Sequence, residues 1–139
     1  MKREIKFRAW HKAEKLMCPV NIITFGEGAF LVGVEKQSDF IAANLLVHAP
    51  TEGRFCKNDE FELLQFTGLK DKKGVEIYEG DIVTYNSRGL DFKGYVVSNN
   101  WEFYYEPIDK FSKDYDHMSY PPGVDIEIIG NIYENPELL

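Results

Sequence analysis

The stretch FTGLKDKKGVEIYEGDIVTY, residues 66–85, decides the fold, because it places three glycines and a run of charge between two apolar segments. Asp71 and Gly74 stand at the first and fourth places of a type I turn that closes on a left-handed residue, a common connection between antiparallel strands. Gly80 and Asp81 form a second turn, from which the apolar run IVTY continues as a strand. The stretch therefore predicts two turns that connect β-strands.

Two ligand-binding interpretations of the same stretch fail on spacing. A phosphate loop needs GxxxxGK[ST] or GxGxxG between a strand and a helix, whereas these glycines stand at positions 68, 74 and 80 and no helix pattern follows them. A calcium loop that began at Asp71 would need oxygen ligands at its third and fifth places, which are Lys73 and Val75. The stretch therefore supports neither a phosphate site nor a calcium site.

The remainder of the chain mostly alternates apolar and polar residues with a period of two, which is typical of strands. In EIKFRAW this alternation separates an apolar set from a largely basic set: Ile5, Phe7 and Ala9 against Lys6, Arg8 and Trp10. Residues 11–15, HKAEK, read as a connection, and turns that contain Gly or Asn follow at residues 26–28, 86–89 and 99–100. Strands therefore dominate the prediction.

Two short segments favour a helix. Residues 39–49, DFIAANLLVHA, bring apolar side chains to one helical face, and Asp39 is available as an N-cap. Near the C-terminus, Asn135 can accept hydrogen bonds from free N–H groups, and Pro136 is tolerated at the first helical position. We therefore expect at most one or two short helices.

Two glycine-led segments indicate the architecture of the C-terminal half: GDIV at residues 80–83 and GYVV at residues 94–97. This rhythm is typical of small SH3-like barrels, in which glycine eases the sharp bend that barrel closure needs. The predicted fold class is mostly β with a minor α component, an SH3-like β-barrel in the C-terminal half and a β-rich N-terminal subdomain. We expect a single compact domain over residues 1–139, with the subdomain at 1–60 and the barrel portion at 61–139.

Length and composition bound the class of protein. A chain of 139 residues, of which 44% are hydrophobic, is long enough to bury the core of one domain. No apolar run approaches the roughly 20 residues that a membrane-spanning helix needs, and the N-terminus lacks the apolar segment of a signal peptide. We therefore expect an intracellular protein that does not enter a membrane.

The net charge of −7 is unevenly placed. Residues 1–15 contain six Lys and Arg against two carboxylates, whereas residues 101–139 contain nine carboxylates against two lysines. The acidic end is expected to repel a nucleic-acid backbone, while the basic end can meet one, or can meet the acidic end of another copy. A homo-oligomer is therefore one of the predicted partnerships.

Three segments lie in order and span both ends and the middle of the chain: IKFRAW at 5–10, TGLKDKKGVEIYEGDIV at 67–83 and GNIYENPELL at 130–139. They closely resemble the signature segments of the YopX-like family, small proteins carried by bacteriophages and prophages. The resemblance implies a mostly β protein with an SH3-like barrel in its C-terminal half, and it supplies no activity and no catalytic residues. The chain departs from the family pattern at His11, where the family usually has Asp.

The densest group of candidate ligands is Asp114, Asp116 and His117, which could ligate a metal or relay a proton. The chain advertises no further ligand beside them, so a solvated acidic loop is the alternative. Cys18 and Cys56 lack CxxC spacing and a neighbouring histidine, which leaves no zinc or redox motif. No catalytic, cofactor-binding or metal-binding residue is therefore assigned, and no cofactor is expected.

A basic-aromatic surface near the N-terminus is the first candidate for binding. Lys6, Arg8 and Trp10 can together stack bases and grip phosphates. In the alternative interpretation they form one face of an edge strand, on which Trp10 covers the barrel.

A second candidate surface lies in the segment WEFYYE. Its alternation places Trp101, Phe103 and Tyr105 in the core. Tyr104 is then left outward between two glutamates, and an exposed aromatic residue on an acidic strand is a signal of protein interaction.

The sequence thus predicts a phage or prophage accessory protein that is a non-catalytic protein-interaction module, with an unidentified host or phage protein as its partner. The expected contact residues are Lys6, Arg8, Trp10 and Tyr104. The alternative is a nucleic-acid-binding protein that uses the basic-aromatic surface. An enzyme would need a pocket of convergent polar groups near the acidic loop.

Overall fold

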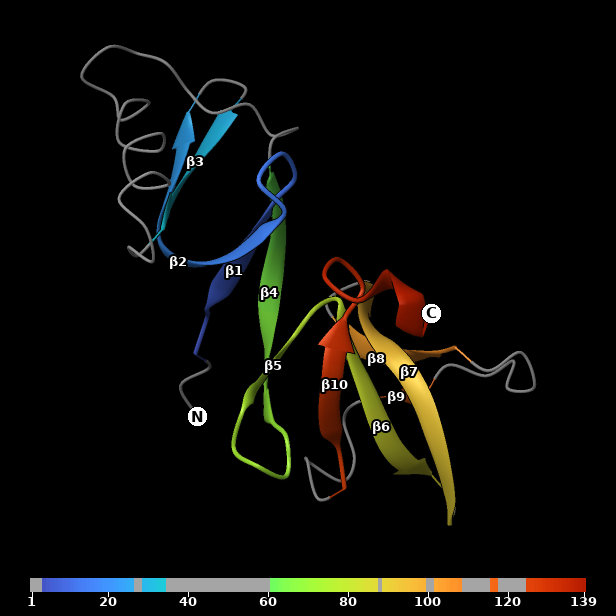
Figure 1. The fold of residues 1–139 in the computed structure, drawn as a ribbon. Helices are drawn as coiled ribbons and strands as arrows, with labels where there is room; N and C mark the ends of the chain where they lie inside the picture. The colour runs from blue at the N-terminus through green and yellow to red at the C-terminus, as the bar shows by residue number, and fades with distance from the viewer. Residues whose placement is uncertain are drawn as a thin grey trace. The chain divides into compact units, whose positions relative to one another are not determined.

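A computed structural model of the chain describes residues 4–26, 29–34, 61–87, 89–99, 102–108, 116–117 and 125–139. The chain divides into two compact units (Figure 1). The N-terminal unit is Lys6–Leu64, and the C-terminal unit combines Met1–Ile5 with Gln65–Leu139. The predicted helix at residues 39–49 lies outside the described residues, as does Cys56.

The described part of the N-terminal unit holds four strands in the hydrogen-bonded order β3-β2-β1-β4. They are β1 (Phe7–His11), β2 (Leu16–Gly26), β3 (Ala29–Val34) and β4 (Phe61–Lys70), the last of which continues into the C-terminal unit. β1 and β2 are antiparallel, with His11 opposite Leu16. The predicted connection forms a turn at residues 12–15, but His11, with which it was expected to begin, is the last residue of β1 and pairs with β2. β2 and β3 form the predicted hairpin, in which Gly26 lies opposite Ala29.

β1 is covered on both of its faces. Ala9 and Trp10 are neighbours whose side chains point to opposite faces of the strand, yet they are only 0% and 8% exposed. Ile5, which the alternation assigns to the apolar face, instead precedes the strand and is 67% exposed. The alternation thus predicts the strand correctly, but a period of two does not say how many of its faces are covered.

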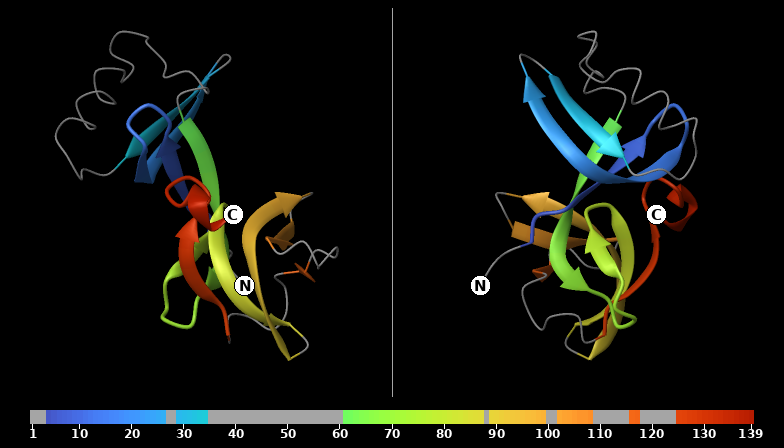
Figure 2. Two further views of the ribbon diagram at one scale, coloured as in Figure 1. Left: turned by 45° about the vertical axis from the view of Figure 1, so that its right-hand side comes forward. Right: turned by 90° about the vertical axis from the view of Figure 1, so that its left-hand side faces the viewer.

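The C-terminal unit is built on a curled sheet with the strand order β10-β6-β7-β8-β9 (Figures 1 and 2). Its strands are β6 (Asp81–Ser87), β7 (Leu90–Asn99), β8 (Glu102–Pro107), β9 (Asp116–His117) and β10 (Glu127–Asn131). Antiparallel hairpins join β6 to β7 and β7 to β8 at the predicted turns, and β10 returns to pair with β6. The described strands therefore form a curled sheet with β10 at one edge and β9 at the other. The predicted mostly β fold class is confirmed.

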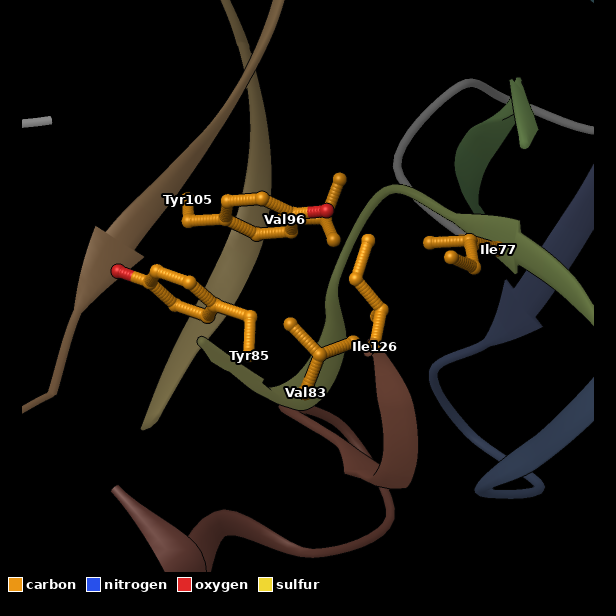
Figure 3. Packing of buried hydrophobic residues seen from close by; sticks show 6 residues of the cluster. All are labelled: Ile77, Val83, Tyr85, Val96, Tyr105 and Ile126. Carbon is orange, nitrogen blue, oxygen red and sulfur yellow. The ribbon is translucent and has the colours of Figure 1, made fainter. Parts of the chain in front are cut away.

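A cluster of buried side chains fills the inner side of this sheet (Figure 3). Its members are Ile77, Val83, Tyr85, Val96, Tyr105 and Ile126. The rings of Tyr85 and Tyr105 stack with their centroids 4.4 Å apart, and Figure 3 shows their hydroxyl groups at opposite ends of the stack. Phe103 packs against the same cluster, as the alternation predicts, whereas Trp101 lies outside the described residues.

The C-terminal segment contains the 3₁₀ helix η1 (Pro136–Leu138), which confirms the predicted helical turn. Asn135 stands at the N-cap position, but its side chain makes no capping hydrogen bond. Its Oδ1 atom instead accepts a hydrogen bond from the N–H group of Asn131, at 3.3 Å. The predicted capping role of Asn135 is therefore wrong, because its side chain satisfies the end of β10 and not the helix.

Candidate interaction surface

The N-terminal candidates Lys6, Arg8 and Trp10 lie at or beside β1 in the N-terminal unit. Trp10 is buried, and Arg8 is half-buried with its Nε atom shielded from solvent. Lys6 is half-buried as well. The burial of Trp10 favours the structural interpretation over base stacking, but the predicted edge strand is wrong, because β1 lies between β2 and β4 in the sheet. The expected base-stacking surface therefore lacks its aromatic ring.

Tyr104 belongs to a different surface, on the C-terminal sheet. Val96 of β7 and Tyr105 of β8 belong to the core, so the residues that alternate with them point to the other side of the sheet. These outward residues pair across the two strands as Tyr95 with Glu106, Val97 with Tyr104, and Asn99 with Glu102. We call these six residues the β7–β8 outer face.

The β7–β8 outer face combines apolar and acidic side chains in contact with solvent. Tyr95, Val97 and Tyr104 are half-buried, and Glu102 is exposed. The Tyr104 hydroxyl donates a hydrogen bond to Oε2 of Glu102, and this bond raises the pKa of Tyr104 above its usual range. The phenol is therefore neutral near pH 7, and a charged carboxylate is held beside its ring.

The charge of the chain is concentrated in the part that carries this face. Residues 65–139 contain 14 Asp and Glu against 7 Lys and Arg, so they account for the whole net charge of −7. The β7–β8 outer face itself contributes Glu102 and Glu106, and Lys93 is the next outward residue along β7. The surroundings of the face therefore favour a cationic partner over an anionic one.

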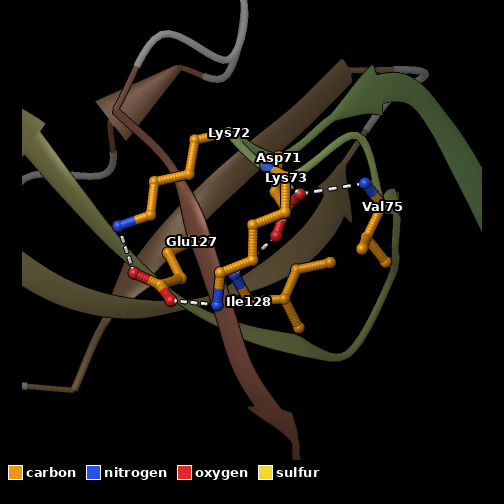
Figure 4. A network of polar contacts seen from close by, with 6 residues as sticks. All are labelled: Asp71, Lys72, Lys73, Val75, Glu127 and Ile128. Carbon is orange, nitrogen blue, oxygen red and sulfur yellow. Dashed lines mark hydrogen bonds and ion pairs between the residues drawn. The ribbon is translucent and has the colours of Figure 1, made fainter.

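The first turn of the stretch at residues 66–85 is held by the Asp71 carboxylate (Figure 4). Asp71 is 6% exposed, and its Oδ1 atom accepts hydrogen bonds from the N–H groups of Lys73 and Val75, at 2.8 and 2.9 Å. Its Oδ2 atom accepts a longer bond, of 3.4 Å, from Ile128 in β10. Burial alone would raise the pKa of Asp71, but the backbone donors outweigh it and lower the pKa. The predicted turn is confirmed.

Two lysines of the same turn reach β10 as well. Lys72 and Lys73 form ion pairs with Glu127 (Figure 4). The N–H group of Lys72 also donates to the carbonyl oxygen of Ile126, at 2.9 Å. The hydrogen bonds from the two lysines lower the pKa of Glu127 to about 2. Together with Asp71 the cluster contains two positive and two negative charges, and we interpret it as a fastening of the turn to the edge of the sheet.

The second predicted turn is also confirmed. Gly80 has a φ of +79°, donates its N–H to the Val96 carbonyl at 2.8 Å and accepts from the N–H of Ile132 at 2.9 Å. Oδ2 of Asp81 accepts a hydrogen bond from the N–H of Tyr78, at 2.8 Å. Both turns of the opening stretch are thus occupied in holding strands together.

The predicted acidic loop contains Asp114, Asp116 and His117, of which the structure describes only two residues. Asp114 lies outside the described residues, and of Asp116 and His117 only the backbone is described, as strand β9 opposite Tyr105 and Tyr104. In the described ranges, no group of three or more His, Cys, Asp or Glu side chains is placed to hold a metal ion. No helix in those ranges is long and apolar enough to cross a membrane. A role for the loop in metal binding or proton transfer stays a prediction.

These observations define a small, mostly β protein whose C-terminal sheet is curled. The chain belongs to the YopX family, since the family model described as "YopX protein" matches residues 6–139. Among solved structures, protein EF1440 from Enterococcus faecalis is similar: the sequence identity is 25%, the TM-score is 0.54, and the alignment covers 99% of each chain. No curated protein matches the chain. Neither the family description nor the name of the similar structure states an activity.

Sequence reasoning singled out Tyr104 and its flanking glutamates but missed Tyr95 and Val97 as their neighbours. The signal was present in the predicted turn at residues 99–100, because a short turn between two strands fixes their register. Pairing of the strands across that turn brings Val97 opposite Tyr104. Alternation within one strand predicts which of its residues share a face. The register between two strands is needed to predict which residues of the neighbouring strand lie on the same face.

Proposed function

We propose that this YopX-family chain is a phage or prophage accessory protein that acts in the host bacterial cytoplasm as a non-catalytic protein-interaction module. Its contact surface is the β7–β8 outer face, and its partner is a host or phage protein. The observation that carries the proposal is the grouping of Tyr95, Val97 and Tyr104 on one half-exposed side of the sheet. The association with phages rests on the resemblance of the family segments.

The chemistry of this face supports binding. Tyrosine presents a large apolar ring with a polar end, and it is enriched among the residues that dominate the energy of protein interfaces. Val97 lies directly opposite Tyr104 and adds apolar area beside the ring. The proposal assigns no catalysis, because the shifted pKa values of Asp71, Tyr104 and Glu127 arise from hydrogen bonds within turns and strands.

The test is a capture experiment with tagged full-length protein in bacterial cells that carry the corresponding phage or prophage. Val97→Arg places a charge in the β7–β8 outer face, and Leu90→Arg is the matched control, because Leu90 is also on β7 and is 64% exposed. We expect one partner to be recovered with the wild type and with Leu90→Arg, and to be lost with Val97→Arg. Recovery of the same partner with all three, or of none with any, contradicts the proposal.

The nucleic-acid alternative is the weaker one. Its basic residues lie near β1, but Trp10, the ring that was to stack on bases, is buried. Lys12, in the same basic stretch, forms an ion pair with Glu62 at 3.3 Å. The alternative predicts retention on DNA or RNA that falls steeply with salt. Failure to bind either polymer at low salt removes it.

A further inference from the structure

We infer that the β7–β8 outer face receives an arginine-bearing segment of its protein partner, with a guanidinium group placed over the Tyr104 ring. The inference rests on the proposed function and names the chemistry of the partner. It depends on three properties of the face: the spacing of its carboxylates around the Tyr104 ring, its apolar area and the sign of its charge.

The first property is the spacing of the carboxylates around the ring. Glu102 and Glu106 stand two residues before and two residues after Tyr104 on β8, so all three side chains leave the same side of the strand. Residues two apart along a strand are separated by roughly 6.5–7 Å. A guanidinium group held within about 6 Å of the ring centroid, as a cation–π contact requires, therefore has a carboxylate within reach on either side.

The second property is the apolar area next to this acidic row. Val97 lies directly opposite Tyr104, and Tyr95 lies opposite Glu106, so the neighbouring strand presents an aliphatic and an aromatic side chain. The three methylene groups of an arginine stem can cover such a surface while its head remains over the ring. A compact ammonium group on lysine lacks the planar face that stacks on tyrosine.

The third property is the sign of the charge. All of the net charge of −7 lies in residues 65–139, and the hydrogen bond from Tyr104 holds the Glu102 carboxylate beside the ring. A cationic segment is therefore attracted over a distance and meets carboxylates on arrival. Lys93 lies two residues before Tyr95 on β7 and points to the same side of the sheet. Its positive charge opposes the approach of a cationic segment beyond Tyr95.

The test uses two synthetic peptides of equal length and equal charge, one with three arginines and one with three lysines, each separated by glycines. Binding to the full-length protein is measured by fluorescence anisotropy at low ionic strength, and the contact surface is mapped by chemical-shift changes in the labelled protein. We expect the arginine peptide to bind about fivefold more tightly than the lysine peptide. The shifts should centre on β7 and β8.

Three variants separate the contributions. Tyr104→Leu keeps apolar bulk and removes the ring, so the preference for arginine should disappear. Glu102→Gln keeps the shape of the side chain and removes its charge, so both peptides should bind more weakly. Glu137→Lys, which exchanges an exposed charge outside the face, is the control and should leave the preference for arginine unchanged.

The outcomes distinguish this inference from the proposed function. Equal binding of the two peptides, no binding of either, or a preference for arginine that survives Tyr104→Leu each overturns the inference. If the capture experiment still yields a partner that is lost with Val97→Arg, the interaction module stands and only its arginine chemistry is wrong. If the captured partner is a second copy of this chain, the inference requires that Tyr104→Leu weakens the self-association, and self-association that is unchanged in this variant also overturns the inference.

Discussion

The hydroxyl group of Tyr105 lies in the core of the C-terminal unit and makes no hydrogen bond within the described structure. Burial there raises the pKa of Tyr105, so the group is neutral at all ordinary pH values. A buried polar group without a partner costs roughly 1–3 kcal/mol. The ring of Tyr105 therefore stabilises the fold through its stacking on Tyr85, while its oxygen opposes folding.

We predict that Tyr105→Phe leaves the free energy of unfolding unchanged or raises it by up to about 1 kcal/mol, because the ring is kept and the unpaired oxygen is removed. Urea unfolding followed by circular dichroism measures this change. Val96→Ala, in the same core, is the control and should lower the free energy of unfolding by about 2 kcal/mol. A loss of similar size in Tyr105→Phe would mean that the hydroxyl has a partner, such as a buried water, and would refute the prediction.

Asp71 makes the stability of the protein depend on pH. Its pKa in the folded state lies below the ordinary value, so its contribution is fully present above the ordinary pKa and is lost as the pH falls through the folded-state pKa. Asp71→Asn should lower the free energy of unfolding near pH 7 by about 2 kcal/mol, because one of the two acceptor oxygens becomes an NH₂ group that faces backbone donors.

The difference between the wild type and Asp71→Asn should shrink as the pH falls below about 4, where the unfolded carboxylate becomes protonated. Urea unfolding at a series of pH values from about 7 to about 3 measures the two curves. A difference that stays constant over this range would show that the carboxylate charge does not matter to the turn.

Alanine substitution at two glycines in the connections between strands can separate the cost of backbone conformation from the cost of packing. Gly74 and Gly80 both have positive φ values, of +84° and +79°. A Cβ atom at Gly74 would meet nothing within 4 Å, whereas one at Gly80 would lie 3.0 Å from the Tyr133 ring. Both alanine variants therefore have strained backbones, and only Gly80→Ala also displaces a neighbour.

We predict that Gly74→Ala lowers the free energy of unfolding by about 1 kcal/mol and Gly80→Ala by about 2–3 kcal/mol. The larger loss includes the strain on the Gly80 hydrogen bonds to Val96 and Ile132, which link the turn to two other segments. Thermal and urea unfolding of the two variants, side by side, give the comparison. Equal losses would assign the whole cost to φ and none to packing.

Sequence reasoning succeeded in this hairpin because its chemistry is local. Asp71 and Asp81 accept hydrogen bonds from N–H groups within four residues, and the positive φ values of Gly74 and Gly80 belong to the glycines themselves, so type and order alone predicted both turns. The hydrogen bond from Ile128 to Asp71 spans 57 residues, and no local pattern predicts it. The same distinction explains the candidate site, since Tyr104 was found from its own strand and Tyr95 only through the strand register.

The burial of Trp10 marks the limit of the same reasoning. An alternating strand has two faces, and the sequence predicts which residues share a face without saying what lies against each. In β1 both faces are covered, so the side assigned to solvent carries a buried indole. The predicted basic-aromatic surface required one face of β1 to be open to solvent. Whether other parts of the protein pack on that face is decided by the tertiary structure.

The net charge of the chain is distributed unevenly between its first 64 residues and the rest. Residues 1–64 contain 9 Asp and Glu against 9 Lys and Arg, whereas residues 65–139 contain 14 against 7. Like charges within the second part repel one another and oppose its compact state. The ion pairs of Lys72 and Lys73 with Glu127 act in the opposite direction, but partly exposed pairs contribute little.

Self-repulsion therefore predicts that added salt stabilises the protein. An increase from about 10 mM to about 0.5 M NaCl shortens the screening length from roughly 30 Å to below 8 Å and should raise the melting temperature by about 2–4 °C. Scanning calorimetry over this range of NaCl concentration measures the rise in melting temperature.

The matched variant is Asp125→Asn combined with Glu137→Gln, which removes two exposed negative charges and changes the net charge from −7 to −5. It should melt at a higher temperature than the wild type in low salt, and the difference should close in high salt, because the charges that it removes are then screened. A wild type that loses stability as salt is added would mean that ion pairs outweigh self-repulsion, and the acidic field that we assign to the β7–β8 outer face would have to be reconsidered with it.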